Sequence, residues 1–312
     1  MRRGMKVLLI VGLIFILLGG GLYLVIHTVF RTTLEESLPI SGPFSFLRNF
    51  VRIDGDLFDI EEKTFYSDKQ SVLSGDVDTM QIQTGTVINL AIDVGGANLR
   101  IKDSQDGSFW LKTDDVDEYQ VYEEDGTFYL KSITTNVFNV IDRGGYIDLY
   151  IPLEYEYEEI DLSIGAVNAQ VESLRAENIT LNVGAGNMEL NLLSGEKIEI
   201  KVGAGNMSVA DIDVKELNAK VDAGNLDIVA AKINEEATLQ CNVGNLDLQL
   251  QSEVNDYNFD LDIAMGKITI DGKEYNAIAR SQEIDHDSHK DIKLKVNVGS
   301  IHVTFASPTH HS

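Results

Sequence analysis

The chain has 312 residues, of which 44% are hydrophobic and 24% are charged, so it is long and apolar enough to fold around a large core. Four of its 25 basic side chains and none of its acids lie in the segment 1–31, so 21 basic and 50 acidic side chains remain after it, a net charge of −29. This negative field repels phosphate and anionic lipid, which argues against nucleic-acid binding and against lying flat on an acidic membrane. It favours cationic partners and loose binding of divalent cations.

An apolar run at residues 7–30 carries no formal charge. As a helix it would rise about 36 Å, enough to cross a hydrocarbon core of about 30 Å. Arg2, Arg3 and Lys6 precede it, so the positive-inside rule predicts a cytoplasmic tip at 1–6, a single-pass signal anchor at 7–30 and an extracytoplasmic body. The alternative is a cleaved signal peptide, but the run is long and no small-x-small cleavage site follows it. Both alternatives export the body of the protein.

The exported part divides into four segments. Residues 31–72 are typical of a juxtamembrane stalk or cap, and residues 306–312 of a polar tail. Residues 73–160 are predicted to be strand-rich, because their apolar and polar residues alternate with a period of two. The clearest of these strands, which suggest a rather flat sheet, are Phe109–Lys112, Tyr119–Tyr122, Thr127–Ile133 and Tyr146–Ile151.

The fourth segment, 161–305, contains an internal repeat. Its most regular copies read Val183-Gly-Ala-Gly-Asn-Met-Glu-Leu190 and Val202-Gly-Ala-Gly-Asn-Met-Ser-Val209. One asparagine recurs at a nearly constant interval, as Asn168, Asn187, Asn206, Asn225 and Asn245, and two less regular copies follow with Lys267 and Ser300 at this position. Such a period predicts an all-β solenoid, a β-helix-like stack of rungs in which like residues of successive coils lie in register.

Alternation within each copy predicts which side chains face the interior. We expect the residues aligned with Val183, Met188 and Leu190 to point inward, and also the column that starts with Ala185. Ala185 and Met188 are three positions apart, so the period slips between them and predicts a corner there. The glycine is expected because a sharp corner commonly needs positive φ, and the asparagines can form a side-chain ladder along the stack. The predicted corner residues are Gly186, Asn187, Gly205, Asn206, Gly224, Asn225, Gly244, Asn245, Gly266 and Gly299.

The repeat gives a structural role to residues that in isolation suggest chemistry. Cys241, the only cysteine, falls in the valine column and is predicted to be a buried thiol, while an intrachain disulfide is excluded. Met188 and Met207 are predicted to fill the core. The glycine-rich corners lack the lysine and Ser/Thr of a phosphate-binding loop, so no nucleotide or other cofactor site is expected.

The densest group of metal-ligand residue types lies in the long insertion between the last two copies. Asp285, Asp287 and His289, with Glu283 and His286 beside them, could offer carboxylate oxygens and an imidazole to a divalent metal. The alternative is a solvated polar loop, the usual character of an insertion.

The pattern resembles the putative-adhesin β-strand-repeat domain family, a family of unknown function, over residues 75–305. The resemblance lies in Asp125-Gly126-Thr127 before an apolar strand, in Ile151-Pro152 before Ile160, in the recurrent Gly-Asn-apolar rungs and in the closing segment 296–303. It implies an envelope-located adhesion or sensing accessory, because some members have one N-terminal span and some belong to bacterial envelope-stress operons. It implies no catalytic residues.

Three functions remain open from the sequence. The first is a non-catalytic binding or scaffold protein of the cell envelope, which displays an acidic solenoid to a protein or cell-wall polymer. The second is a β-helix enzyme that acts on envelope polysaccharide, although Trp110 is the only tryptophan and 50 acids make neighbouring carboxylates uninformative. The third is a sensing partner whose helix contacts another membrane protein.

Overall fold

A computed structural model describes residues 72–73, 77–82, 86–116, 118–133, 145–152, 155, 157–276 and 280–306. In this part of the chain, twenty strands and one short 3-10 helix confirm the all-β prediction. No helix among these residues is long and apolar enough to cross a membrane. The predicted anchor at 7–30, the tip before it and nearly all of the stalk lie outside the described residues, as does the tail after residue 306.

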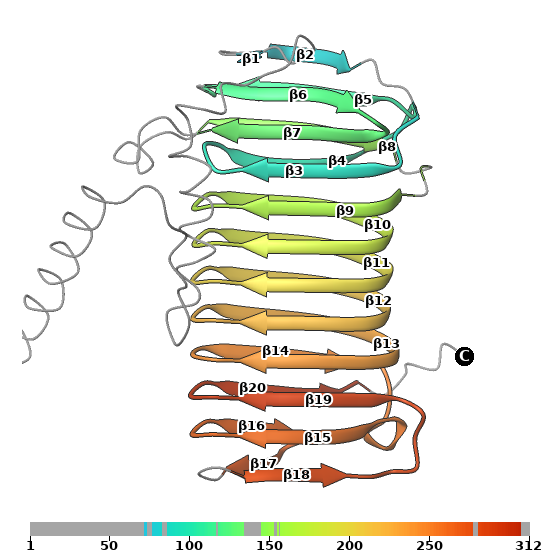
Figure 1. Ribbon diagram of the computed structural model, residues 1–312, viewed down its shortest axis with the longest axis vertical. Helices are drawn as coiled ribbons and strands as arrows, with labels where there is room; N and C mark the ends of the chain where they lie inside the picture. The colour runs from blue at the N-terminus through green and yellow to red at the C-terminus, as the bar shows by residue number, and fades with distance from the viewer. Residues whose placement is uncertain are drawn as a thin grey trace, which may run out of the picture. The chain divides into compact units, whose positions relative to one another are not determined.

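The regular repeats form a parallel coil in the middle of the stack (Figure 1). Each long strand pairs with the next in unbroken register, from Asn168 with Asn187 to Val183 with Val202. The first half of β10 lies on β4 and its second half on β9, so one long strand contributes to both sides of the coil. The strands of this coil are β9 (Tyr157–Ile164), β10 (Asn168–Val183), β11 (Asn187–Val202), β12 (Asn206–Val221), β13 (Asn225–Cys241) and β14 (Asn245–Leu250).

The N-terminal end of the stack does not follow chain order. Strands β3 (Asn89–Val94) and β4 (Asn98–Ser104) pair in parallel with β9 and β10, and β7 (Thr127–Ile133) and β8 (Tyr146–Pro152) lie one rung further out. Antiparallel strands then cover this end. They are β5 (Phe109–Asp114) and β6 (Glu118–Glu124), followed by β1 (Val72–Leu73) and β2 (Val77–Ile82). The described strands between residues 73 and 160 therefore continue the same stack.

The C-terminal end is rearranged in the same way. The final strands, β19 (Asp291–Val296) and β20 (Ser300–Phe305), stack directly on β13 and β14. The preceding rung, β15 (Asn258–Ile263) and β16 (Lys267–Ile270), is reached through the 3-10 helix Val254–Asp256 and lies beyond them. Strands β17 (Lys273–Asn276) and β18 (Arg280–Ile284) cover it in antiparallel fashion. The register of like residues is confirmed, but stacking of successive rungs in chain order is wrong at both ends.

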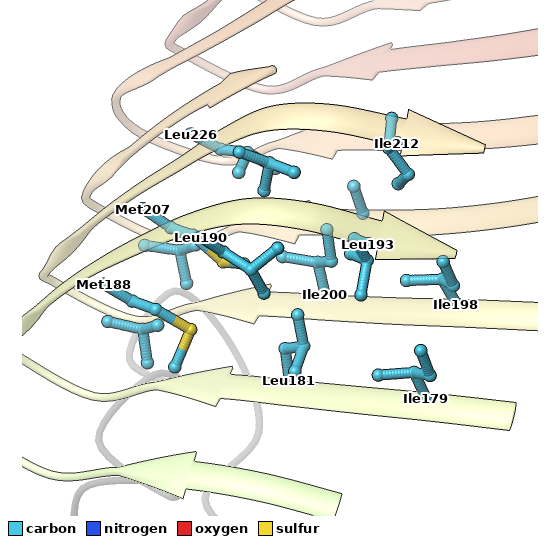
Figure 2. Packing of buried hydrophobic residues seen from close by; sticks show 14 of the residues in the cluster. Ile179, Leu181, Met188, Leu190, Leu193, Ile198, Ile200, Met207, Ile212 and Leu226 are labelled. Carbon is cyan, nitrogen blue, oxygen red and sulfur yellow. The ribbon is translucent and has the colours of Figure 1, made fainter. Parts of the chain in front are cut away.

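The interior is a continuous column of apolar side chains. Met188, Met207 and Leu226 lie one above another on successive strands, as Figure 2 shows, and all three are buried. Burying one such side chain contributes about 1.5–3 kcal/mol, and no rung could shield its own apolar face from water without its neighbours. The inward columns that start at Val183, Met188 and Leu190 are therefore confirmed.

The predicted direction of the alanine column is wrong. Ala185, Ala204 and Ala223 are exposed, and so are their counterparts Val243, Val298 and Met265, at 52%, 52% and 67%. In the three regular copies the inward residue of the corner is the buried glycine, Gly186, Gly205 or Gly224, so the period slips between Val183 and Gly186. The slip lies two residues earlier than predicted, at bends over residues 184–186, and the predicted corner residue Asn187 instead begins β11.

The corner glycines are needed for close packing more than for positive φ. Of the six, only Gly244 has a positive φ, at 138°. A Cβ atom on Gly205 or Gly224 would overlap the carbonyl oxygen of the corner glycine one rung away, well inside van der Waals contact. Space between stacked backbones therefore selects glycine at these corners.

Candidate binding face

The predicted asparagine ladder is present along one side of the coil. The Nδ2 group of Asn187 donates to Oδ1 of Asn168 at 2.8 Å, and the same bond recurs at 2.7–2.9 Å from Asn206, Asn225 and Asn245 to the preceding rung. Ser300 closes the row with its hydroxyl on Oδ1 of Asn245, 2.7 Å away. The row is exposed, so a line of amide groups repeats at about the 4.8 Å spacing of the rungs.

A second polar row lies on the corner itself. Asn242 donates from Nδ2 to Asp222, and Asn297 donates to Asn242, both at 2.6 Å. Lys220 pairs with the same Asp222 carboxylate at 2.9 Å. Sequence reasoning missed this row because the earlier copies have glycine at the position. The change from Gly203 to Asp222 and Asn242 was the signal that could have revealed it.

A shallow groove of about 540 Å³ runs beside the asparagine ladder over several rungs. One wall is the ladder, and the other is the row of outward residues two positions later. This second row changes character along the stack, from basic Arg100 at one end through Gln170 to acidic Glu189 and Asp227. The groove is open and elongated, a shape that fits contact along a chain-like partner.

The basic end of the groove is bounded by aromatic side chains. Tyr146 and Tyr150 stand on the outer face of β8, and Trp110 on β5 pairs with Tyr150. Between the two tyrosines lies Asp148, which is only 5% exposed and accepts hydrogen bonds from Arg100 Nε and from Lys102 Nζ, the latter at 3.1 Å. The sequence did not reveal this cluster because its members lie on β4, β5 and β8, well apart in the chain.

The predicted metal candidates lie in the loop between β18 and β19. The backbone N–H of Asp287 donates to Oδ1 of Asp285 at 2.9 Å, a local turn that fits the positive φ of Asp287, 56°. The Oδ1 atom of Asn258 accepts from the N–H groups of His286 and Ser288 at 2.9 and 3.2 Å. His286 Nδ1 lies 2.7 Å from the carbonyl oxygen of Tyr257 and must therefore carry a proton.

These hydrogen bonds explain the polar residues of the loop by its own folding. Within the described ranges, no group of three or more His, Cys, Asp or Glu side chains is arranged to hold a metal ion. The metal role of Asp285, Asp287 and His289 stays a prediction without geometric support.

Cys241 is fully buried in the valine column, as the repeat predicts. Removal from water, with a smaller effect of the Asp247 carboxylate, raises the pKa of its thiol to about 11. A thiol held in this protonated form is a poor nucleophile, which fits a packing role.

The geometry defines an all-β repeat protein with an elongated polar face. The family model described as Toastrack DUF4097 matches residues 87–218 and again residues 158–304, and the chain belongs to this Toastrack family. This membership confirms the resemblance to putative-adhesin β-strand-repeat domains of unknown function. A comparison with curated proteins gave no match.

Several solved structures are similar to this chain over most of their length. One, described as a putative adhesin from Bacteroides fragilis, is 15% identical with a TM-score of 0.40, over 76% of this chain and 98% of that one. A putative adhesin from Parabacteroides distasonis is 12% identical, also with a TM-score of 0.40, over 76% and 97%. A protein from the same species, described as a putative lipid binding protein, is 14% identical with a TM-score of 0.36, over 77% and 96%.

Proposed function

We propose that this protein is a non-catalytic binding or scaffold component of the bacterial cell envelope, which engages a polymeric partner along the stacked face of its solenoid. The observation that carries the proposal is the groove beside the asparagine ladder, which extends from Asn98 on β4 to Asn225 on β13. Binding along several rungs lets many weak polar contacts add up. A rigid parallel stack holds those contacts at a fixed spacing, so little conformational entropy is lost on binding.

The proposal includes a cellular location and a membrane topology for the protein. The uncharged run at 7–30, preceded by three basic residues, supports a single-pass anchor with the N-terminus in the cytoplasm and the solenoid outside. The acidic body would be repelled by anionic lipid, which favours its projection away from the membrane surface. Cationic groups on the partner would be attracted to the acidic part of the groove, near Glu189 and Asp227.

Co-sedimentation with purified cell-wall material tests this proposal. We expect the full chain and a chain without residues 1–30 to sediment equally with the wall material, because the solenoid makes the contacts. Charge reversal at Glu189 and Asp227 to lysine should reduce the sedimented fraction. The same change at Glu235 and Glu236, which are exposed on the other half of the coil, should not.

Two outcomes would contradict the proposal. Release of new reducing ends from the wall material would support the polysaccharide-active alternative. Loss of all retention on removal of residues 1–30, with capture of a membrane protein by the full chain only, would support the sensing alternative.

A further inference from the structure

We propose that the cluster of Trp110, Tyr146, Tyr150, Arg100, Lys102 and Asp148, named here the aromatic end, binds neighbouring sugar rings of an uncharged glycan. This inference rests on the proposed function, because the aromatic end opens into the groove that would hold the rest of the polymer. Arg100 and Tyr146 belong to the aromatic end and also line the groove. The cluster therefore specifies which kind of polymer the groove receives.

The aromatic rings are held in fixed positions by cations. The Arg100 guanidinium lies over the Tyr146 ring, 4.4 Å from its centroid, and Lys102 Nζ lies 5.3 Å from the Tyr150 centroid. Both cations are bound to the buried Asp148 between the two tyrosines. Because both cations bind one carboxylate, the guanidinium of Arg100 and the ammonium group of Lys102 are held in place, and their cation–π contacts restrict the Tyr146 and Tyr150 rings. The arrangement is preorganised before any ligand arrives.

The exposed surfaces of this cluster are of two kinds. Tyr146 is 38% exposed, one of the few large hydrophobic side chains among the described residues to be so open. Tyr150, four residues further along β8, and its cross-strand partner Trp110 are half-buried. Hydrogen-bonding groups line the groove with the Tyr146 ring, namely the guanidinium of Arg100 and the amides of Asn98 and Asn168. Flat apolar rings beside amide and guanidinium groups suit a ligand with one apolar face and a polar edge.

A pyranose ring has this composition, with C–H groups on a face and hydroxyl groups around the edge. Nucleic-acid bases also stack on aromatic side chains, but their phosphates would meet Glu189 and Asp227 further along the groove and the strong negative charge of the chain. Acidic glycans would be repelled in the same way. The charge distribution therefore favours an uncharged glycan.

The tryptophan provides a direct measurement, because Trp110 is the only one in the chain. Its fluorescence is recorded on the full-length protein, in a detergent without a sugar headgroup, during titration with the hexasaccharide of N-acetylglucosamine. We expect a saturable spectral change, and no such change with polygalacturonate. Tyr146→Ala should weaken the hexasaccharide affinity by about tenfold or more, since an exposed aromatic anchor is lost.

Tyr129→Ala is the matched control. Tyr129 is a half-buried tyrosine on β7, stacked on Tyr122 with centroids 4.6 Å apart, and lies on the other half of the coil. We expect this variant to bind the hexasaccharide like the unaltered protein. Circular dichroism melting of both variants checks that each remains folded.

Three results would overturn the inference: no saturable change with the hexasaccharide, unchanged affinity after Tyr146→Ala, or equal binding of polygalacturonate. The wall co-sedimentation assay separates this failure from that of the proposed function. If the Tyr146→Ala protein still sediments fully with wall material while charge reversal at Glu189 and Asp227 abolishes sedimentation, the binding function stands and the sugar site is wrong.

Discussion

The corners of the coil bring backbone against backbone, and the glycines there have no room for a side chain. Gly224 sits against the carbonyl oxygen of Gly205, and Gly205 against that of Gly186, so one close approach repeats along the stack. A methyl group at any of these positions would force two rungs apart or tilt a corner. The effect would extend to the adjoining asparagine, whose ladder bond depends on the same spacing.

Gly224→Ala is expected to lower the free energy of unfolding by about 1–3 kcal/mol, the usual cost of forcing extra atoms into a packed site. Gly95→Ala is the matched control, because its Cβ would lie 4.0 Å from the nearest atom and its φ is not positive. That variant should stay within about 0.5 kcal/mol of the unaltered protein. Urea denaturation measures both changes, and equal destabilisation would contradict the steric explanation.

Cys241 makes stability depend on pH in the alkaline range. The folded thiol has a pKa of about 11, whereas the unfolded thiol has its ordinary value of 9.0, so between these values the unfolded chain loses its proton first. Ionisation therefore favours unfolding as pH rises, and the contribution lost between about pH 9 and 11 is about 2–3 kcal/mol. Cys241→Val, which matches Val221 and Val296 in the same column, should remove this part of the alkaline loss. A pH series of urea denaturation compares the two proteins, and identical pH profiles would contradict the burial of the thiol.

At the scale of the element, the asparagine ladder fixes how one rung lies on the next. A strand that slipped by one residue would break the ladder and turn its apolar side chains outward. Asn206 both donates to Asn187 and accepts from Asn225, so it joins three rungs. The ladder thus specifies register on the outside while the apolar columns specify it inside.

Asn206→Ala removes two side-chain hydrogen bonds and should cost about 1–3 kcal/mol of stability, with each bond worth about 0.5–1.5 kcal/mol. Asn218→Ala offers a control on the same strand, where the side chain is exposed on the other half of the coil. We expect that change to be nearly neutral. Thermal melts measure the unfolding midpoints of both variants. If Asn218→Ala lowered the midpoint as much as Asn206→Ala did, the role of the ladder would be refuted.

The columns of aligned residues in the repeat made much of the regular coil predictable from the sequence. A buried alternation and the nearly constant interval between the aligned asparagines could predict the parallel rungs, their register and the buried Cys241. The direction of Ala185 could not be predicted, because small residues fit both the inside and the outside of a corner. The aromatic end was also out of reach, because it depends on Trp110, Tyr150 and Lys102 meeting across strands whose pairing is not encoded in any local period.

The ends of the stack were predictable only in part. Asp125-Gly126 and Asp271-Gly272 have positive φ in both residues of each pair and form the tight turns of antiparallel hairpins. The first pair was recognised as part of the family pattern, but the second was not predicted to be a hairpin. The two hairpins mark where the parallel coil gives way to antiparallel caps.

At the scale of the whole molecule, the rungs at both ends of the parallel stack are out of chain order and are covered by antiparallel strands. At the N-terminal end, the rung β3–β4 lies between the regular coil and the rung β7–β8. At the C-terminal end, the rung β19–β20 lies between the regular coil and the rung β15–β16. The antiparallel hairpins then cover the last parallel edges, and β17 presents the charged Lys273 and Glu274. Covered and charged edges discourage pairing between copies of the chain.

The most direct measurement concerns the order in which the rungs of the solenoid are stacked. In a Cys241→Val background, cysteines replace Asp247 together with His302, which are paired neighbours on β14 and β20. In a second variant they replace Asp247 together with Thr269, which lies two rungs away on β16. Neighbouring strands place Cα atoms about 4.8 Å apart, within disulfide range, whereas two rungs separate them by about 9.6 Å, beyond it. We predict that oxidation links only the first pair, as seen by non-reducing electrophoresis and peptide mass analysis. A disulfide in the second pair and none in the first would mean that the rungs follow chain order at this end, and that β19–β20 is not inserted between β13–β14 and β15–β16.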